Sequence, residues 1–130
     1  MSTYISVSDV TDSISEGIDL EPYLMEADDA IEDLAERLGV REATDIETAP
    51  IHYKVKRYGI AYALMRMCQD RIAKAQSDTI PEQNKYSIMY GLYRRELKEL
   101  DGSISAEMMT GDVQQIRDRA NNMTAVLYRG

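Results

Sequence analysis

The chain has 130 residues, of which 44% are hydrophobic and 29% charged, the size and balance of one soluble globular domain. Its single cysteine, Cys68, excludes an internal disulfide and a multi-cysteine zinc site, and no stretch approaches the roughly 20 apolar residues of a membrane span. The net charge of −8 is unevenly spread, because residues 1–47 carry −12 and residues 48–130 carry +4.

The first expected element is a short helix that passes through Val10 and Ile14. Ser6 or Ser8 would cap it, and it would end before Gly17. We expect this helix to be weak and peripheral.

A second helix is predicted between Asp19, its N-cap, and Gly39, which suits the left-handed position after a last turn. Apolar residues recur there at alternating spacings of four and three, the pattern of a helix with one buried face. They are Leu20, Leu24, Ala27, Ile31, Leu34 and Leu38. Acidic residues fill the rest of the circumference, and we expect five of them at a partner interface. These are Asp28, Asp29, Glu32, Asp33 and Glu36.

A third, long helix is predicted from Thr48 or Ala49, with Pro50 in its first turn, to about Gln76. Its middle is apolar nearly all round, which is typical of the central helix of a bundle. We therefore expect other helices to pack on more than one side of it.

A fourth helix is predicted from residues 77–79, with Pro81 in its first turn, to about Leu100, where Asp101 and Gly102 close it. Short connections favour antiparallel neighbours. The predicted fold is an all-α, up-and-down bundle over residues 1–102, with three long helices and the short N-terminal one.

Two glycines, Gly59 and Gly91, lie inside the third and fourth helices, each next to a tyrosine. Glycine within a helix costs about 1 kcal/mol relative to alanine, so its presence calls for a packing reason. We expect the two helices to approach closely there, each glycine making room for a facing tyrosine.

Residues 103–130 have a poor helical period, and we expect an extended, irregular C-terminal arm. Such an apolar arm either packs back over the bundle or reaches into another molecule. We favour the second, because exposed apolar segments usually mark interfaces. The candidate contacts are Met108, Met109, Met123, Leu127, Tyr128 and Arg129.

Residue patterns for catalysis are missing from the sequence. His52 and Cys68 lie 16 positions apart on one predicted helix, about 24 Å along its axis, too far to form a nucleophile and base. A di-iron bundle site needs more histidines, and the glycines form no phosphate-binding loop. We expect neither an enzyme nor a bound metal or cofactor.

Basic residues form two clusters, Lys54, Lys56 and Arg57 in the third helix and Arg94, Arg95 and Lys98 in the fourth. They allow two interpretations. A small helical DNA-binding regulator would use Lys54, Arg57, Arg94 and Arg95 on phosphates. Alternatively, the clusters receive the acidic second helix of a neighbouring subunit, or that helix is only a solvated face.

The order of parts resembles the head-to-tail connector, or adaptor, proteins of tailed bacteriophages. The resemblance is carried by the opening Tyr-Ile-Ser-Val-Ser-Asp-Val at 4–10, the acidic helix, the apolar run Val-Lys-Arg-Tyr-Gly-Ile-Ala-Tyr-Ala-Leu at 55–64, the further helix and the arm.

This resemblance implies a structural virion protein, made in the host cytoplasm and located at the head-to-tail junction. About twelve copies would form a ring that docks beneath the portal protein, contacts tail or tail-completion proteins and extends the DNA channel. DNA would pass without sequence-specific binding, no membrane would be involved, and the arm would reach into the portal or a neighbour.

Overall fold

The computed structural model describes residues 2–48, 51–74 and 80–111. Within these ranges all regular structure is helical, and three of the helices are long. The predicted all-α helical bundle is therefore confirmed.

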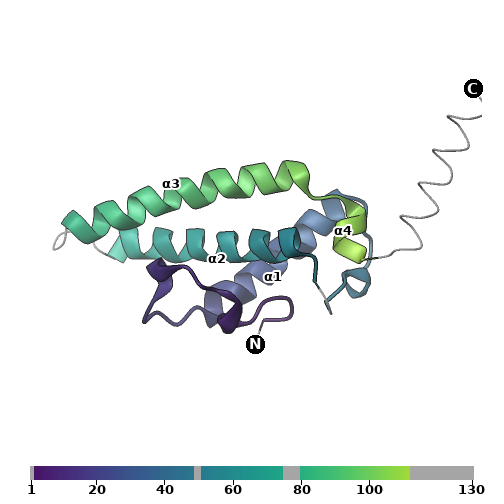
Figure 1. Cartoon of the computed structure of the whole chain (residues 1–130), viewed down its shortest axis with the longest axis horizontal. Coiled ribbons are helices and arrows are strands. Elements are labelled where there is room, and N and C mark those ends of the chain that lie inside the picture. Colours follow the sequence, from purple (N-terminus) through teal and green to yellow (C-terminus); the bar gives the residue numbers. More distant parts are fainter. Residues whose placement is uncertain (1, 49–50, 75–79, 112–130) are drawn as a thin grey trace, which may run out of the picture.

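The helix α2 (Tyr53–Lys74) is the centre of the molecule. Helix α3 (Ile80–Ser103) runs antiparallel beside it, while α1 (Glu21–Arg37) crosses α2 obliquely (Figure 1). The short helix α4 (Ala106–Thr110) turns back against the start of α2. This arrangement leaves the outward sides of α1 and α3 open to contacts with other molecules.

The N-terminal segment forms two 3-10 turns, Val7–Asp9 (η1) and Ser13–Ser15 (η2), in place of the single short helix predicted. Ser6 caps the first turn as expected, accepting a hydrogen bond from the Ser8 amide at 3.2 Å. The turns do not merge into one helix because Val10 at the end of η1 is extended, with φ −93° and ψ 112°.

This segment is also not peripheral, contrary to the prediction. Tyr4, Ile5 and Ile14 are buried in the hydrophobic core. A segment with little regular structure of its own thus contributes three core side chains, and they are long-range neighbours of α1 and α2.

The helix α1 lies where it was predicted, but its N-cap residue is Leu20 and not Asp19. The Asp19 carboxylate accepts a 3.1 Å hydrogen bond from the Glu21 amide, and Gly39 follows the helix with φ +94°. The predicted apolar stripe is buried except for Leu38, which is half-buried. One face of α1 therefore packs on α2, as the periodicity indicated.

The helix α2 begins at Tyr53, after the predicted start, and a connector with one 3-10 turn, Ala43–Asp45 (η3), precedes it. His52 acts as its cap, because its Nδ1 accepts from the Lys54 amide at 3.1 Å and its carbonyl from the Lys56 amide at 3.0 Å. The middle of α2 is buried nearly all round, as expected for a central helix.

Gly59 and Gly91 have different surroundings from those predicted. A Cβ on Gly59 would lie 2.8 Å from Ile31 Cδ1 and closer still to Ile5 Cδ1, so Gly59 makes room for the N-terminal segment and α1 and not for a tyrosine of α3. Gly91 is exposed, and nothing lies within 4 Å of a Cβ built there. Packing within the chain explains Gly59 alone.

The bundle extends past the boundary expected at residue 102. Ile104 and Met109 are 4% and 1% exposed and belong to the core, and the Met109 carbonyl accepts a 2.9 Å hydrogen bond from the Glu47 amide. Ser105 caps α4 and Gly111, with φ +60°, ends it, so the chain folds back onto α2. Met109 is thus a core residue and not the exposed contact predicted, and residues 112–130 lie outside the described structure.

Candidate interaction surfaces

An open groove of about 660 Å³ lies between α1 and α2. Its floor consists of Ala30 on α1 and the side chains of Tyr58 and Tyr62 on α2. Charged residues of α1 form the rest of its lining, and four of the five are acidic. They are Glu26, Asp29, Asp33, Glu36 and Arg37. We call this site the acidic groove.

The charges at the two ends of the acidic groove are paired within the chain. Glu26 forms a 3.1 Å ion pair with Arg66. The Arg37 guanidinium donates hydrogen bonds of 3.2 Å to both carboxylate oxygens of Asp101. Asp29, Asp33 and Glu36 are exposed and have no hydrogen bond or ion pair within the described part of the chain. These are the three members of the predicted acidic set that remain available to a partner.

The other two predicted acids, Asp28 and Glu32, bind the N-terminal segment of their own chain. Asp28 accepts hydrogen bonds of 2.7 Å from the Ser2 hydroxyl and the Thr3 amide. Glu32 accepts a 3.0 Å bond from the Tyr4 hydroxyl, and burial together with this bond raises the pKa of Tyr4. These two acids are therefore already hydrogen-bonded within the chain, and their role at a partner interface stays a prediction.

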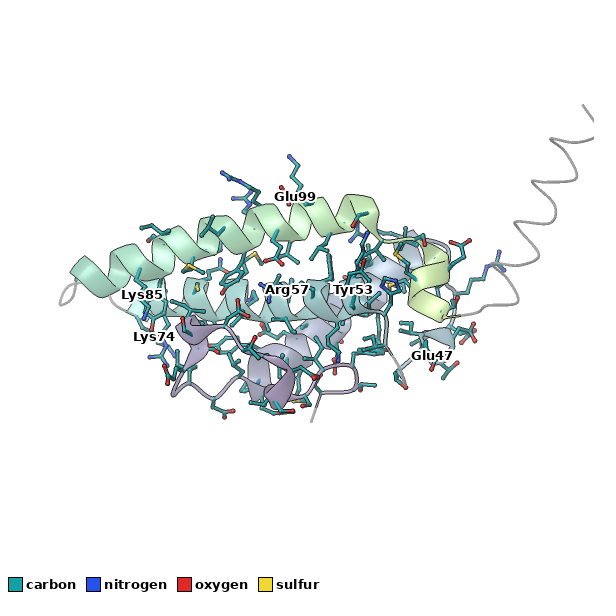
Figure 2. All side chains as sticks on the ribbon, in the orientation of Figure 1. Glu47, Tyr53, Arg57, Lys74, Lys85 and Glu99 are labelled. Carbon is teal, nitrogen blue, oxygen red and sulfur yellow. The ribbon has the colours of Figure 1, made fainter. Side chains whose placement is uncertain are left out.

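The second surface is the side of α3 that points away from α2. Ile88 and Leu92 are 63% and 48% exposed, and Gly91 lies between them in open space. The predicted basic cluster borders these three residues, and Figure 2 shows the neighbouring Glu99 on the same outward side of the helix. We call this surface the outer face of α3. It consists of Ile88, Gly91, Leu92, Arg94, Arg95, Lys98 and Glu99.

Arg94, Arg95 and Lys98 are exposed and have no hydrogen-bond or ion-pair partner among the described residues. The structure therefore brings the second predicted basic cluster together on one accessible helix face. The position of these cations is set by the opposite side of α3, where Tyr93 and Leu97 face the bundle.

Arg57, from the first basic cluster, is used inside the molecule (Figure 2). Its guanidinium donates to the two Asp12 oxygens at 3.0 and 3.2 Å and to Glu96 at 2.9 Å. Tyr93 donates to the same Asp12 carboxylate at 2.8 Å. These hydrogen bonds to Glu96 and Asp12 raise the pKa of Arg57. Arg57 thus joins three parts of its own fold, and its role as a partner residue stays a prediction.

The rest of the first cluster does not form a strong basic surface either. Lys56 pairs with Asp9 at 3.4 Å, and Lys54 is half-buried near the start of α2. The charge of Arg57 is compensated by two carboxylates. This lowers the phosphate affinity expected of a surface made of Lys54, Arg57, Arg94 and Arg95.

Cys68 lies in the core, and His52 lies directly before α2. Cys68 is fully buried, and burial raises the pKa of its thiol to about 11. His52 stacks on Tyr53 with ring centroids 4.7 Å apart. Across residues 2–48, 51–74 and 80–111, no group of three or more His, Cys, Asp or Glu side chains could hold a metal ion.

Sequence reasoning missed the apolar centre of the outer face of α3. Ile88 and Leu92 are not among the predicted interface residues, although they lie on the side of the helix opposite Tyr86, Met89 and Tyr93, which face the core. Of the predicted arm contacts, Met108 is half-buried on α4. Met109 is buried beside it, and the four remaining arm contacts lie outside the described residues, namely Met123, Leu127, Tyr128 and Arg129.

No protein-family model, curated protein or solved structure matches this chain. None of the helices in the described ranges is long and apolar enough to span a bilayer. The functional argument therefore depends on the acidic groove, the outer face of α3 and the order of the structural parts.

Proposed function

We propose that this chain is a structural virion protein of a tailed bacteriophage, a head-to-tail connector that forms a ring between the portal and the tail. The protein acts by binding its neighbours, and the ring that the copies form extends the channel through which DNA passes. The partners are the portal protein, a tail or tail-completion protein, and further copies of the same chain.

One observation carries this proposal. The two outer helices present accessible surfaces of opposite charge, with Asp29, Asp33 and Glu36 on α1 and Arg94, Arg95 and Lys98 on α3. Surfaces that differ in this way suit a heterologous contact, in which one patch meets a different patch of the next copy. Repetition of such a contact around a closed rotation gives a ring.

The order of parts supports the same proposal. The chain begins with a segment that is hydrogen-bonded to α1, and this is followed by the acidic helix, the central buried helix and a further long helix. This is the layout that resembles the phage connectors. Residues 112–130 are proposed to contact the portal or a neighbouring copy through Met123, Leu127, Tyr128 and Arg129.

The test is a pull-down with the full chain as bait from a lysate of phage-infected source cells, with partners identified by mass spectrometry. We expect portal and tail-completion proteins. The variant Leu127→Asp should lose the portal, while the matched variant Asn122→Asp, which adds the same charge nearby, should keep it.

Recovery of DNA together with transcription components, and of no virion protein, would contradict the connector and favour the regulator. In that case duplex binding by the purified chain should weaken steeply with salt, because phosphate contacts release counterions.

A further inference from the structure

The acidic groove has the features of a seat for a helix. A small residue, Ala30, lies at its floor, two tyrosine side chains provide apolar area, and the acids Asp29, Asp33 and Glu36 stand at the rim. A matching helix needs a small residue at its closest point, apolar side chains on either side of that residue, and cations at its margin.

The outer face of α3 has these three features. Gly91 is flanked by Ile88 and Leu92, and Arg94, Arg95 and Lys98 follow within the next two turns. An exposed glycine inside a helix is unfavourable for the isolated chain, and no neighbour among the described residues requires it. A helix that approaches Gly91 from outside gives it a packing reason.

The two surfaces also agree in length. From Ile88 to Lys98 the outer face of α3 spans about 15 Å, and from Glu26 to Glu36 the rim of the groove spans about 15 Å, since a helix rises 1.5 Å per residue. The three cations at 94–98 and the three acids at 29–36 lie within these lengths, and none of the six has a partner among the described residues.

We infer that the outer face of α3 of one copy docks into the acidic groove of a second copy, with Gly91 over Ala30. A single copy cannot satisfy both surfaces itself, because α1 and α3 lie on different sides of α2. The contact is therefore head to tail, and each copy uses its groove for one neighbour and its α3 for the other. The inference deepens the proposed connector function and rests on it for the expectation that copies associate.

The test traps this contact between two differently labelled copies of the full chain. One copy carries Ala30→Cys and the other Gly91→Cys, and the mixture is oxidised with oxidised glutathione at high protein concentration. We expect a disulfide-linked heterodimer in high yield. A pair in which Ala73→Cys replaces Ala30→Cys is the control, because Ala73 is an exposed alanine of α2 outside the groove. The native Cys68 is buried and should not take part.

Charge reversal then tests the complementarity within the same pair. Asp29→Lys with Asp33→Lys on the Ala30→Cys copy should lower the yield severalfold. Arg95→Glu with Lys98→Glu on the Gly91→Cys copy should restore it. Glu42→Lys with Asp45→Lys on the Ala30→Cys copy makes the same charge change at exposed acids between α1 and α2. This control should leave the disulfide yield unchanged.

The inference is overturned if the 30–91 yield does not exceed the 73–91 yield, or if charge reversal on both copies fails to restore it. These results are separate from those of the pull-down. A chain that recovers the portal but shows no 30–91 disulfide is a connector with a different subunit contact. A chain that forms the disulfide but recovers no virion protein is a self-associating protein with another function.

Discussion

The Tyr93 hydroxyl of α3 donates a 2.8 Å hydrogen bond to Asp12, which lies 81 positions earlier in the chain. The same carboxylate binds the guanidinium of Arg57 on α2. One acidic side chain in the N-terminal segment thus connects that segment to both α2 and α3. Because the Asp12 side chain is partly buried, its hydrogen bonds contribute more to the stability of the fold than those of a fully exposed ion pair do.

We expect Asp12→Ala to lower the free energy of unfolding by about 2 kcal/mol, because it leaves two polar groups without their shared acceptor. Tyr93→Phe removes one hydroxyl only and should cost about 1 kcal/mol. Urea unfolding measures both, and Asp45→Ala, at an exposed carboxylate, is the matched control. Equal stability of the Asp12→Ala and Asp45→Ala proteins would show that the connection is energetically silent.

The same carboxylate predicts a pH dependence. Burial by itself raises the pKa of Asp12, but hydrogen bonds from Arg57 and Tyr93 outweigh it, and the pKa lies below its ordinary value. The stabilisation is therefore complete above the unfolded pKa of about 3.9 and is lost as the pH falls through the lower folded pKa. Urea unfolding between neutral and acidic pH should show a shallower acid loss in Asp12→Asn than in the parent. Parallel profiles would refute the assignment.

Gly59 and Gly91 should respond oppositely to alanine. Gly59→Ala places a methyl group against Ile5 and Ile31 and should destabilise the fold by about 1 to 3 kcal/mol, as overpacking does. Gly91→Ala meets nothing and should stabilise the monomer by up to about 1 kcal/mol, through helix propensity. Thermal unfolding compares them, and Ile5→Val should partly rescue Gly59→Ala. A stabilising Gly59→Ala would mean that the N-terminal segment does not pack there.

The two adjacent methionines of α4 give a matched pair. Met109→Ala should cost about 2 to 5 kcal/mol, because it empties a fully buried position. Met108→Ala, at a half-buried side chain, should cost clearly less. Denaturant unfolding of the full chain measures both. Indistinguishable variants would place α4 off the core and return residues 103–111 to the arm.

Cys68 should be chemically silent in the folded protein. It is fully buried, and burial raises the pKa of its thiol to about 11, so little thiolate forms at neutral pH and reagent access is blocked. Ellman's reagent should react with Cys68 only as fast as the chain unfolds. Ala73→Cys adds an exposed thiol that should react at once, and rapid reaction of two thiols in that variant would contradict the burial.

The parts of the fold that follow from sequence are those set by local periodicity and caps. In α1 the apolar stripe and Gly39 concern residues close together in the chain and lie as predicted, and the N-cap is one residue after the predicted Asp19. The burial of α2 follows from apolar residues on every side of it. Local pattern was sufficient in both cases because packing and propensity agree.

The failures come from contacts between distant segments. Nothing near Ile5 in the sequence reveals that it fills the space left by Gly59, 54 positions later. Whether a charged side chain is free to bind a partner is likewise set by the tertiary structure. Arg57 pairs with Asp12, 45 positions away, and Asp28 accepts a hydrogen bond from Thr3, 25 positions away. The sequence shows which residues carry charge, and only the structure separates the charges that are already paired within the chain from those that have no partner among the described residues.

The closure of α4 has a consequence for how the protein is made. Ile104 and Met109 complete a core that otherwise begins at Tyr4, and the backbone bond from Glu47 to Met109 joins segments far apart in sequence. During synthesis from the N-terminus the core stays incomplete until residue 109 has left the ribosome, however long the earlier helices have been exposed. Newly made chains thus expose part of their apolar interior to one another on the polysome, and the folding of α4 ends that exposure.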